Sequence, residues 1–146
     1  GLLTESGSIF AASYGGELAC VDSDSGQITW RRSIKSYTGL APAGKLVIVT
    51  DESGVIWALD AATGAAAWTQ KALLYRKLSP PAVLDGNVVV GDVDGCLHWL
   101  NPTDGSIIGR TRGGSDPIRA AMTVQDNVLY VMNNAGKITA VTAKLR

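Results

Sequence analysis

Residues 54–68 read GVIWALDAATGAAAW, and they match residues 16–30, GELACVDSDSGQITW, position for position. A third copy begins at Gly95 and a fourth at Gly136. Self-similarity at a nearly fixed period of about 40 residues is typical of architectures that repeat one supersecondary unit. The chain is therefore predicted to consist of one unit repeated four times.

Each unit has the pattern of short β-strands separated by turns. An apolar run precedes each leading glycine, and a polar pair or trio lies between the run and the glycine, as in Asp51-Glu52-Ser53-Gly54. Strand signals at short, regular intervals within such a period predict four strands per unit. The fold class is thus predicted to be all-β, with β-propeller blades of four antiparallel strands. Helix-forming residues at 65–78 favour a helix instead, but the repeat predicts a strand there, with at most a helical turn at 71–77.

The repeat also sets the domain organisation. Residues 1–146 are expected to form one partial β-propeller with blades at approximately 1–36, 37–76, 77–115 and 116–146. The last unit stops before its outer strand. Four blades of a larger ring, predicted to have eight, would leave a sheet face uncovered at each end.

A short motif that recurs in the units has a structural role in closing a hairpin turn. An Asp or Asn side chain can accept hydrogen bonds from amides two residues further on, and a glycine four residues later supplies the left-handed conformation that closes the hairpin. A tryptophan then starts the outer strand, where it suits packing between neighbouring blades. The third unit has Gly109 at the tryptophan position, and the fourth has Thr142 at the Asp position. The predicted structural residues are Asp22, Gly26, Trp30, Asp60, Gly64, Trp68, Asn101 and Gly105.

Composition excludes several classes of protein. Hydrophobic residues make up 46% of the chain, enough for a packed core, and 13 basic residues balance 13 acidic ones. Without concentrated Lys and Arg, nucleic-acid binding is not expected. The apolar runs are too short for a transmembrane segment. The first residues lack the features of a signal peptide, so a mature form or an excised fragment is expected. Cys20 and Cys96 show no CxxC spacing and are expected to be buried, unpaired thiols.

Chemical motifs are weak. Residues 39–45 have the glycine and lysine spacing of a phosphate-binding loop, but Leu46 replaces the required Ser or Thr. Residues 22–26 begin like a calcium loop, yet no bidentate Glu follows, so a hairpin turn is expected. Asp92 and Asp94 could share a cation, although two carboxylates are few for this purpose. His98, the only histidine, is expected to be a structural residue with its hydrogen bonds satisfied. We therefore predict no catalytic, cofactor-binding or metal-binding residue, and the sequence identifies no partner-binding residue.

The pattern Ala-x-Asp-x-x-Thr-Gly-x-x-x-Trp at residues 58–68 resembles the repeat of the PQQ-type quinoprotein propellers. Residues 68–100, with Leu73-Leu74, Arg76, Gly91-Asp92 and Leu97-His98-Trp99, are similar to the BamB family of outer-membrane assembly lipoproteins. The whole chain resembles the C-terminal half of that family.

The resemblance implies a non-catalytic scaffold in an eight-bladed propeller. It implies a place on the periplasmic face of the bacterial outer membrane, a lipid anchor in the full-length protein, and binding to the periplasmic POTRA domains of BamA through residues mostly outside this chain. Because four blades are half of eight, a homodimer that closes the ring is a further expectation. The alternative is a fragment of a PQQ-dependent dehydrogenase, in which the cofactor lies on the propeller axis over a calcium ion.

Overall fold

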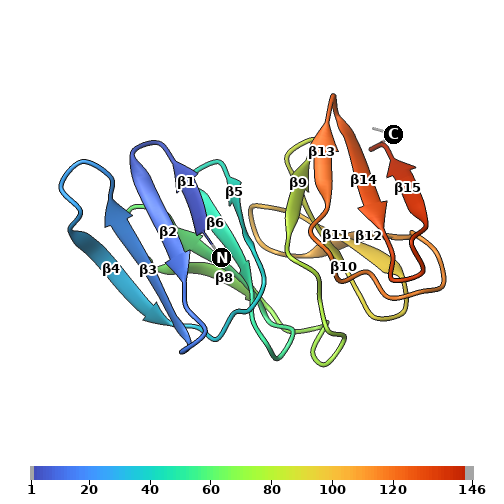
Figure 1. The fold of residues 1–146 in the computed structure, drawn as a ribbon, viewed down its shortest axis with the longest axis horizontal. Helices are drawn as coiled ribbons and strands as arrows, with labels where there is room; N and C mark the ends of the chain where they lie inside the picture. The colour runs from blue at the N-terminus through green and yellow to red at the C-terminus, as the bar shows by residue number, and fades with distance from the viewer. Residues whose placement is uncertain (1, 144–146) are drawn as a thin grey trace.

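The structure is a computed structural model that describes residues 2–143 (Figure 1). Within that range every regular element is a β-strand, and each sheet is antiparallel with its strands in chain order. The first sheet consists of β1 (Leu2–Glu5), β2 (Ser8–Ala12), β3 (Glu17–Asp22) and β4 (Ile28–Ser33). The second consists of β5 (Leu40–Ala43), β6 (Leu46–Thr50), β7 (Ile56–Asp60) and β8 (Ala66–Gln70).

The other two sheets follow the same order. The third contains β9 (Ala82–Leu84), β10 (Asn87–Gly91), β11 (Cys96–Leu100) and β12 (Ile107–Arg112). The fourth has three strands among the described residues, namely β13 (Thr123–Gln125), β14 (Val128–Met132) and β15 (Ile138–Val141). The all-β prediction and the unit of four antiparallel strands are confirmed.

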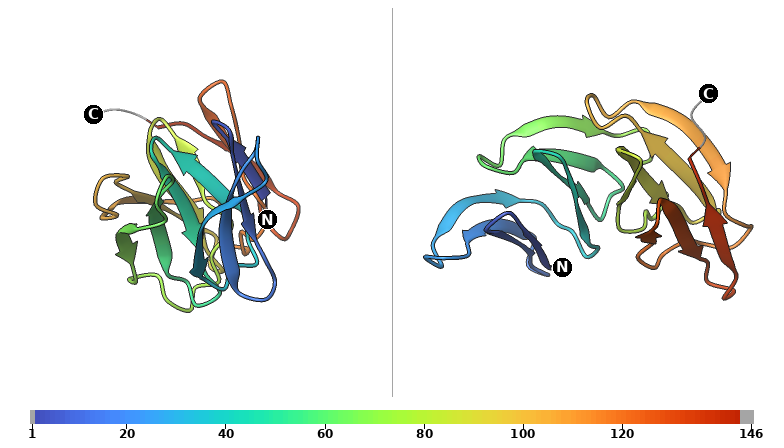
Figure 2. Two further views of the ribbon diagram at one scale, coloured as in Figure 1. Left: turned by 90° about the vertical axis from the view of Figure 1, so that its left-hand side faces the viewer. Right: turned by 90° about the horizontal axis from the view of Figure 1, so that it is seen from above.

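The four sheets are arranged as an open arc, best seen from above in the right-hand view of Figure 2. The first strands of successive sheets contact one another along the inside of the arc: β1 with β5, β5 with β9 and β9 with β13. The last strands, β4, β8 and β12, lie along the outside. Each sheet therefore radiates from a common axis and packs on the face of the next.

Three apolar layers fill the spaces between neighbouring sheets. Phe10, Leu18 and Trp30 of the first sheet pack with Val47 and Val49 of the second. The second layer joins the second and third sheets through Ile48, Ile56, Trp68, Val88 and Leu100. The third joins the third and fourth sheets through Leu97, Trp99, Leu129 and Val131. Because β6, β10 and β11 are covered on both faces, nearly all of their side chains are buried, which explains the continuous apolar runs of β6 and β10.

The sheets have two distinct ends. At one, which we call the connection end, the turns between the second and third strands meet the segments that link one sheet to the next. The same hydrogen bond recurs there, from Glu52 N to Lys35 O (2.8 Å), Val93 N to Arg76 O (3.0 Å) and Asn134 N to Pro117 O (2.9 Å). The opposite end, which we call the turn end, carries the Asp-x-x-x-Gly turns between the third and fourth strands.

Residues 66–70 form a strand despite their helix-forming composition. Pairing of β8 with β7 places Trp68 opposite Ala58, where it is buried in the second apolar layer. This tertiary burial outweighs the small helix preference of alanine. Residues 71–77 form hydrogen-bonded turns instead of a helix, with Leu73 fully buried.

Candidate functional site

The Asp-x-x-x-Gly turns are held by the side chain that opens them. Asp22 Oδ1 accepts from the amides of Asp24 and Ser25 at 3.0 and 2.8 Å, and these hydrogen bonds lower the pKa of Asp22. Asp60 Oδ1 accepts from the amides of Ala62 and Thr63 in the same way, and Asn101 accepts from Thr103. The closing residues Gly26, Gly64 and Gly105 have φ values of 73°, 76° and 75°. The carboxylates of these turns are therefore used to hold the backbone.

Two of these turns also hold a tryptophan from the preceding sheet. The Trp30 indole Nε1 donates to Ala61 O at 3.0 Å, and a Cβ placed on Gly64 would lie 2.6 Å from Cδ2 of the Trp30 ring. Trp68 Nε1 donates to Pro102 O at 2.8 Å, and its ring lies against Gly105 in the same manner. A tryptophan, an indole hydrogen bond and a glycine thus join the first sheet to the second and the second to the third.

The third sheet differs from this pattern because its tryptophan lies on the third strand instead of the fourth. Trp30 and Trp68 lie opposite the small residues Cys20 and Ala58 on the neighbouring strand, whereas Trp99 of β11 lies opposite Gly109. Large and small residues have exchanged strands, and Trp99, 8% exposed, still fills the layer between sheets. The loss of tryptophan at position 109 is therefore compensated by the paired strand. Trp99 Nε1 bonds to Thr111 of its own sheet, so it does not lock the third sheet to the fourth.

A second repeated residue lies at the connection end, at positions 51, 92 and 133. Asp51 Oδ1 accepts from the amides of Ser53 and Val55, and the carboxylate of Asp92 and the amide oxygen of Asn133 bind the equivalent amides. The sequence analysis recognised these segments as turns and missed the role of the side chain. The even spacing of the three positions along the chain was the available signal.

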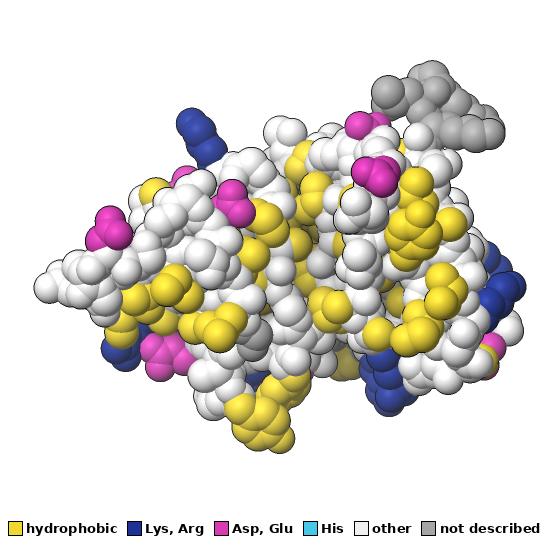
Figure 3. Space-filling view, turned by 45° about the horizontal axis from the view of Figure 1, so that its top comes forward, with side chains coloured by type: hydrophobic (Ala, Val, Ile, Leu, Met, Phe, Trp, Pro, Cys, Tyr) yellow, Lys and Arg dark blue, Asp and Glu magenta, His cyan; other side chains and the backbone are white. Residues whose placement is uncertain are grey.

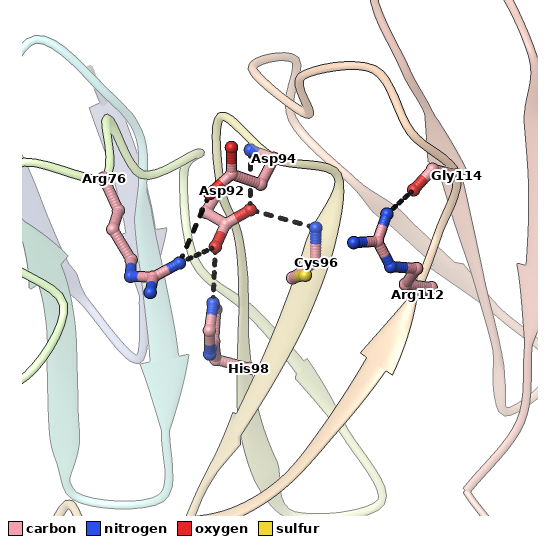
Figure 4. A network of polar contacts seen from close by, with 7 residues as sticks. All are labelled: Arg76, Asp92, Asp94, Cys96, His98, Arg112 and Gly114. Carbon is pink, nitrogen blue, oxygen red and sulfur yellow. Dashed lines mark hydrogen bonds and ion pairs between the residues drawn. The ribbon is translucent and has the colours of Figure 1, made fainter.

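The most developed polar cluster of the described chain surrounds Asp92 (Figure 4). Asp92 is fully buried, and its Oδ2 lies 2.7 Å from His98 Nε2 and 3.1 Å from Arg76 Nη1. Arg76 also lies 3.5 Å from Asp94 Oδ2. Burial alone would raise the pKa of Asp92, but hydrogen bonds from His98 and the Cys96 amide outweigh it and hold the pKa below its ordinary value.

This cluster changes two expectations. The cation shared by Asp92 and Asp94 is the guanidinium of Arg76, which comes from the preceding connection and was not foreseen. His98 is buried as expected, yet only Nε2 is hydrogen-bonded, and Nδ1 has no partner. The prediction of a fully satisfied histidine was therefore wrong at that atom. The cluster ties that connection to the third sheet.

The remaining sequence candidates lie in ordinary strands and turns. In the segment at 39–45, Leu40–Ala43 is strand β5 and no helix follows among the described residues, so the segment lacks the geometry of a phosphate-binding loop. Cys20 is buried and unpaired as expected, whereas Cys96 is unpaired but only half-buried, so the expectation of a buried thiol was wrong there. Within residues 2–143, no group of three or more His, Cys, Asp or Glu side chains could hold a metal ion. No helix of that range is long and apolar enough to cross a membrane.

Apolar side chains remain exposed on the two outermost sheets. Tyr130, Met132 and Ile138 lie on the outer face of the fourth sheet and are 41%, 49% and 67% exposed. Leu2 and Ile28 of the first sheet are 77% and 45% exposed. On the face drawn in Figure 3, hydrophobic side chains reach the surface in several separate groups. The second and third strands of the inner sheets, by contrast, are largely buried on both faces.

Radial antiparallel sheets, the first two of which dock an indole on a turn of the next sheet, define the chain as four blades of a β-propeller. Within that class the chain is similar to the BamB family along nearly its whole length. The family model "Outer membrane protein assembly factor BamB" matches residues 2–70. The BamB of Pseudomonas aeruginosa is 38% identical over 144 residues, which are 99% of this chain and 38% of that protein. The predicted resemblance to the BamB family is confirmed.

Solved structures agree with this assignment. BamB from Moraxella catarrhalis superimposes with a TM-score of 0.90 at 30% identity, over 95% of this chain and 41% of that one. The chain thus spans about two fifths of the length of these relatives. A quinohemoprotein alcohol dehydrogenase from Comamonas testosteroni matches with a TM-score of 0.74 at 18% identity, which shows a shared fold alone.

Proposed function

We propose that this chain is part of a non-catalytic scaffold of the β-barrel assembly machinery. In this role it assists the folding and insertion of outer-membrane proteins as a component that binds the periplasmic domains of BamA. The observation that supports the proposal is its similarity, along 99% of its length, to a protein named as an outer membrane assembly factor. The buried polar groups agree with a scaffold, because Asp92 and His98 hold one another and the neighbouring backbone.

The proposed location is the periplasmic face of the outer membrane. It is supported by the names of the relatives, which are outer membrane assembly factors. In a protein of the relatives' full length, a lipid anchor would hold the propeller at that membrane. The BamA interface is proposed to lie mostly in blades outside this chain.

A chimera tests the proposed function directly. The matching segment of Pseudomonas aeruginosa BamB is replaced by this chain, and the chimera is expressed in a strain that lacks BamB. We expect it to restore the amounts of folded outer-membrane proteins to near the level given by the parent BamB. A matched chimera with Trp68→Ala controls for blade packing. Normal protein level without restoration of outer-membrane protein assembly would contradict the proposal.

The second candidate is a PQQ-dependent dehydrogenase propeller, which the fold similarity to the quinohemoprotein favours. Its test is titration of the folded chain with PQQ and calcium, followed by absorbance and calorimetry. The scaffold proposal expects no saturable binding. Saturable binding accompanied by oxidation of an alcohol or a sugar would favour the dehydrogenase instead.

A second copy of the chain is proposed to cover the exposed sheet faces. The fourth sheet of one copy would pack on the first sheet of the other, so that a two-fold pair closes a ring of eight blades. The exposed Tyr130, Met132 and Ile138 on one face and Leu2 on the other support this proposal. Burial of such apolar faces stabilises association by about 25 cal/mol per Å² before the costs of association.

A further inference from the structure

A hollow of about 470 Å³ opens at the connection end of the arc. Three successive connections supply its wall: Tyr37 precedes β5, Lys77 precedes β9 and Arg119 precedes β13. Because β5, β9 and β13 are the innermost strands of their sheets, the hollow lies beside the axis of the arc. We call it the axial groove.

The acidic side chains of the axial groove have hydrogen-bond or ion-pair partners among the described residues, whereas its basic side chains do not. Asp51 accepts from two amides and from the indole of Trp57 at 3.0 Å. The carboxylate of Glu52 lies 3.8 Å from Lys35 Nζ. Glu52 also accepts a hydrogen bond from the hydroxyl of Tyr37, and this hydrogen bond raises the pKa of Tyr37. Within residues 2–143, Lys77 and Arg119 have no carboxylate within ion-pair distance. The two cations of the groove therefore lack an ion-pair partner in that range, whereas Glu52 pairs with Lys35 and Asp51 is hydrogen-bonded to neutral donors.

The backbone holds Lys77 in an unfavourable conformation. Of the non-glycine residues with positive φ between 2 and 143, four are Ser, Asp or Asn in tight hairpin turns, whereas Tyr75 (63°) and Lys77 (51°) are large residues of a connection. A left-handed conformation costs such residues about 1–2 kcal/mol each. It is enforced by Tyr75 N donating to Ser53 O, and by Arg76, which lies between the two and is bound to Asp92. Backbone strain that the surrounding contacts enforce is common at binding sites.

Exposed aromatic side chains accompany the positive charges. The rings of Tyr14 and Tyr37 lie 5.0 Å apart and are 87% and 53% exposed. Tyr75, 84% exposed, lies on the connection that carries Lys77. Tyrosine is enriched at protein interfaces because it combines a large apolar ring with a polar tip and few rotatable bonds. Three tyrosines near two unpaired cations thus give this end of the fold the composition of a peptide-binding surface.

We propose that the axial groove binds an extended acidic segment of another polypeptide. Carboxylates of the segment would pair with Lys77 and Arg119, and its apolar or aromatic side chains would pack on the Tyr14 and Tyr37 rings. Charge complementarity selects the ligand, since Lys77 and Arg119 are the charged groups of the groove that have no ion-pair partner and no hydrogen-bonded donors or acceptors within residues 2–143. This site is separate from the proposed BamA interface and goes beyond the proposed function, so it can be tested without BamA.

The test uses a short fluorescein-labelled peptide of alternating Glu and Phe with both ends blocked, and fluorescence anisotropy as the readout. We expect saturable binding that weakens with salt, and about tenfold weaker binding by the Lys77→Gln/Arg119→Gln variant, as two exposed ion pairs would give. The control variant Lys45→Gln/Arg110→Gln removes the same charge from exposed sites outside the groove. It is expected to bind like the unaltered chain, and circular dichroism verifies that each variant is folded.

Four results would overturn the inference. These are no binding of the Glu-Phe peptide, equal binding of a Gln-Phe peptide, equal weakening by both double variants, and displacement of the peptide by PQQ at lower concentration than by unlabelled peptide. The last result would assign the groove to a small carboxylate ligand. None of the four bears on the BamB chimera, so failure here is distinguishable from failure of the proposed function.

Discussion

The indole ring of Trp30 lies directly against the α-carbon of Gly64, a residue of the next sheet. A Cβ on Gly64 would lie 2.6, 2.7 and 3.0 Å from three atoms of that ring. The ring nitrogen donates a hydrogen bond to Ala61 O of the same turn. The repeated turn thus has two roles, because it closes its own hairpin and receives the aromatic ring of the preceding blade. Gly26 closes the first turn with nearly the same φ but has nothing within 4 Å of an added Cβ.

Comparison of Gly64→Ala with Gly26→Ala isolates the docking role. Both changes place a Cβ on a left-handed residue, which costs about 1–2 kcal/mol. Only Gly64→Ala also forces the Trp30 ring to move, which adds about 1–3 kcal/mol of overpacking. Urea unfolding followed by circular dichroism should therefore show the larger loss of stability for Gly64→Ala. Equal losses would contradict the docking role.

Trp68→Ala should cost about 3–5 kcal/mol, as other large-to-small core changes do. Trp68 is 8% exposed between the second and third sheets and donates to Pro102 O. Trp68→Phe keeps most of the ring volume but removes the donor, so the carbonyl loses a bond worth about 1 kcal/mol. Chemical denaturation of both variants measures the difference. An unchanged midpoint for Trp68→Ala would refute its placement in the core.

The acid stability of the chain should depend on Asp92. Its folded pKa lies below the unfolded value of about 3.9, so its contribution is complete above that pH and is lost as the pH falls through the folded pKa. Asn133 holds the equivalent turn of the fourth sheet, so Asp92→Asn should keep the turn and lose only the charge. We expect a loss of about 2 kcal/mol at neutral pH and a flatter decline of stability below about pH 5.

The matched control for that prediction is Asp94→Asn. Asp94 is exposed and shares Arg76 with Asp92, so its change should cost less than about 1 kcal/mol. Thermal unfolding measured across the acid range distinguishes the two carboxylates. Parallel pH profiles for Asp92→Asn and the unaltered chain would show that the buried cluster does not carry the acid sensitivity.

Sedimentation equilibrium tests the proposed two-fold ring. We expect a species near twice the chain mass of 15.2 kDa at micromolar concentration. Met132→Lys places a charge on the outer face of the fourth sheet and should shift the equilibrium toward the monomer, while Lys137→Gln in the turn between β14 and β15 should not. A folded monomer of the unaltered chain would contradict the pairing of these faces.

The fold could be predicted from the sequence because its determinants are local and repeated. The Asp60 to Gly64 turn and the apolar runs before each glycine recur at nearly constant spacing, so each copy supports the interpretation of the others. The strand at 66–70 was predicted against its own propensity for this reason. The exchange of Trp99 and Gly109 was not foreseen, since it depends on which residues pair across two strands.

The polar clusters could be predicted only in part. Asp92 binds the amides of its own turn, a local contact, but Arg76 reaches it from a connection 16 residues earlier in the chain. The axial groove is assembled from three connections that lie far apart in the sequence, at residues 37, 77 and 119. No spacing rule relates such residues, because their proximity follows from the arc of the sheets.

Retention of the protein on immobilised BamA periplasmic domains most directly tests the central claim, that the protein is a scaffold that binds BamA. Immobilised periplasmic domains are incubated with this 146-residue chain and, in parallel, with a version that has the full length of its relatives. We predict that the longer protein is retained and that this chain is retained weakly or not at all. Equal retention would place the interface within residues 1–146, and failure of the longer protein to bind would contradict the scaffold function.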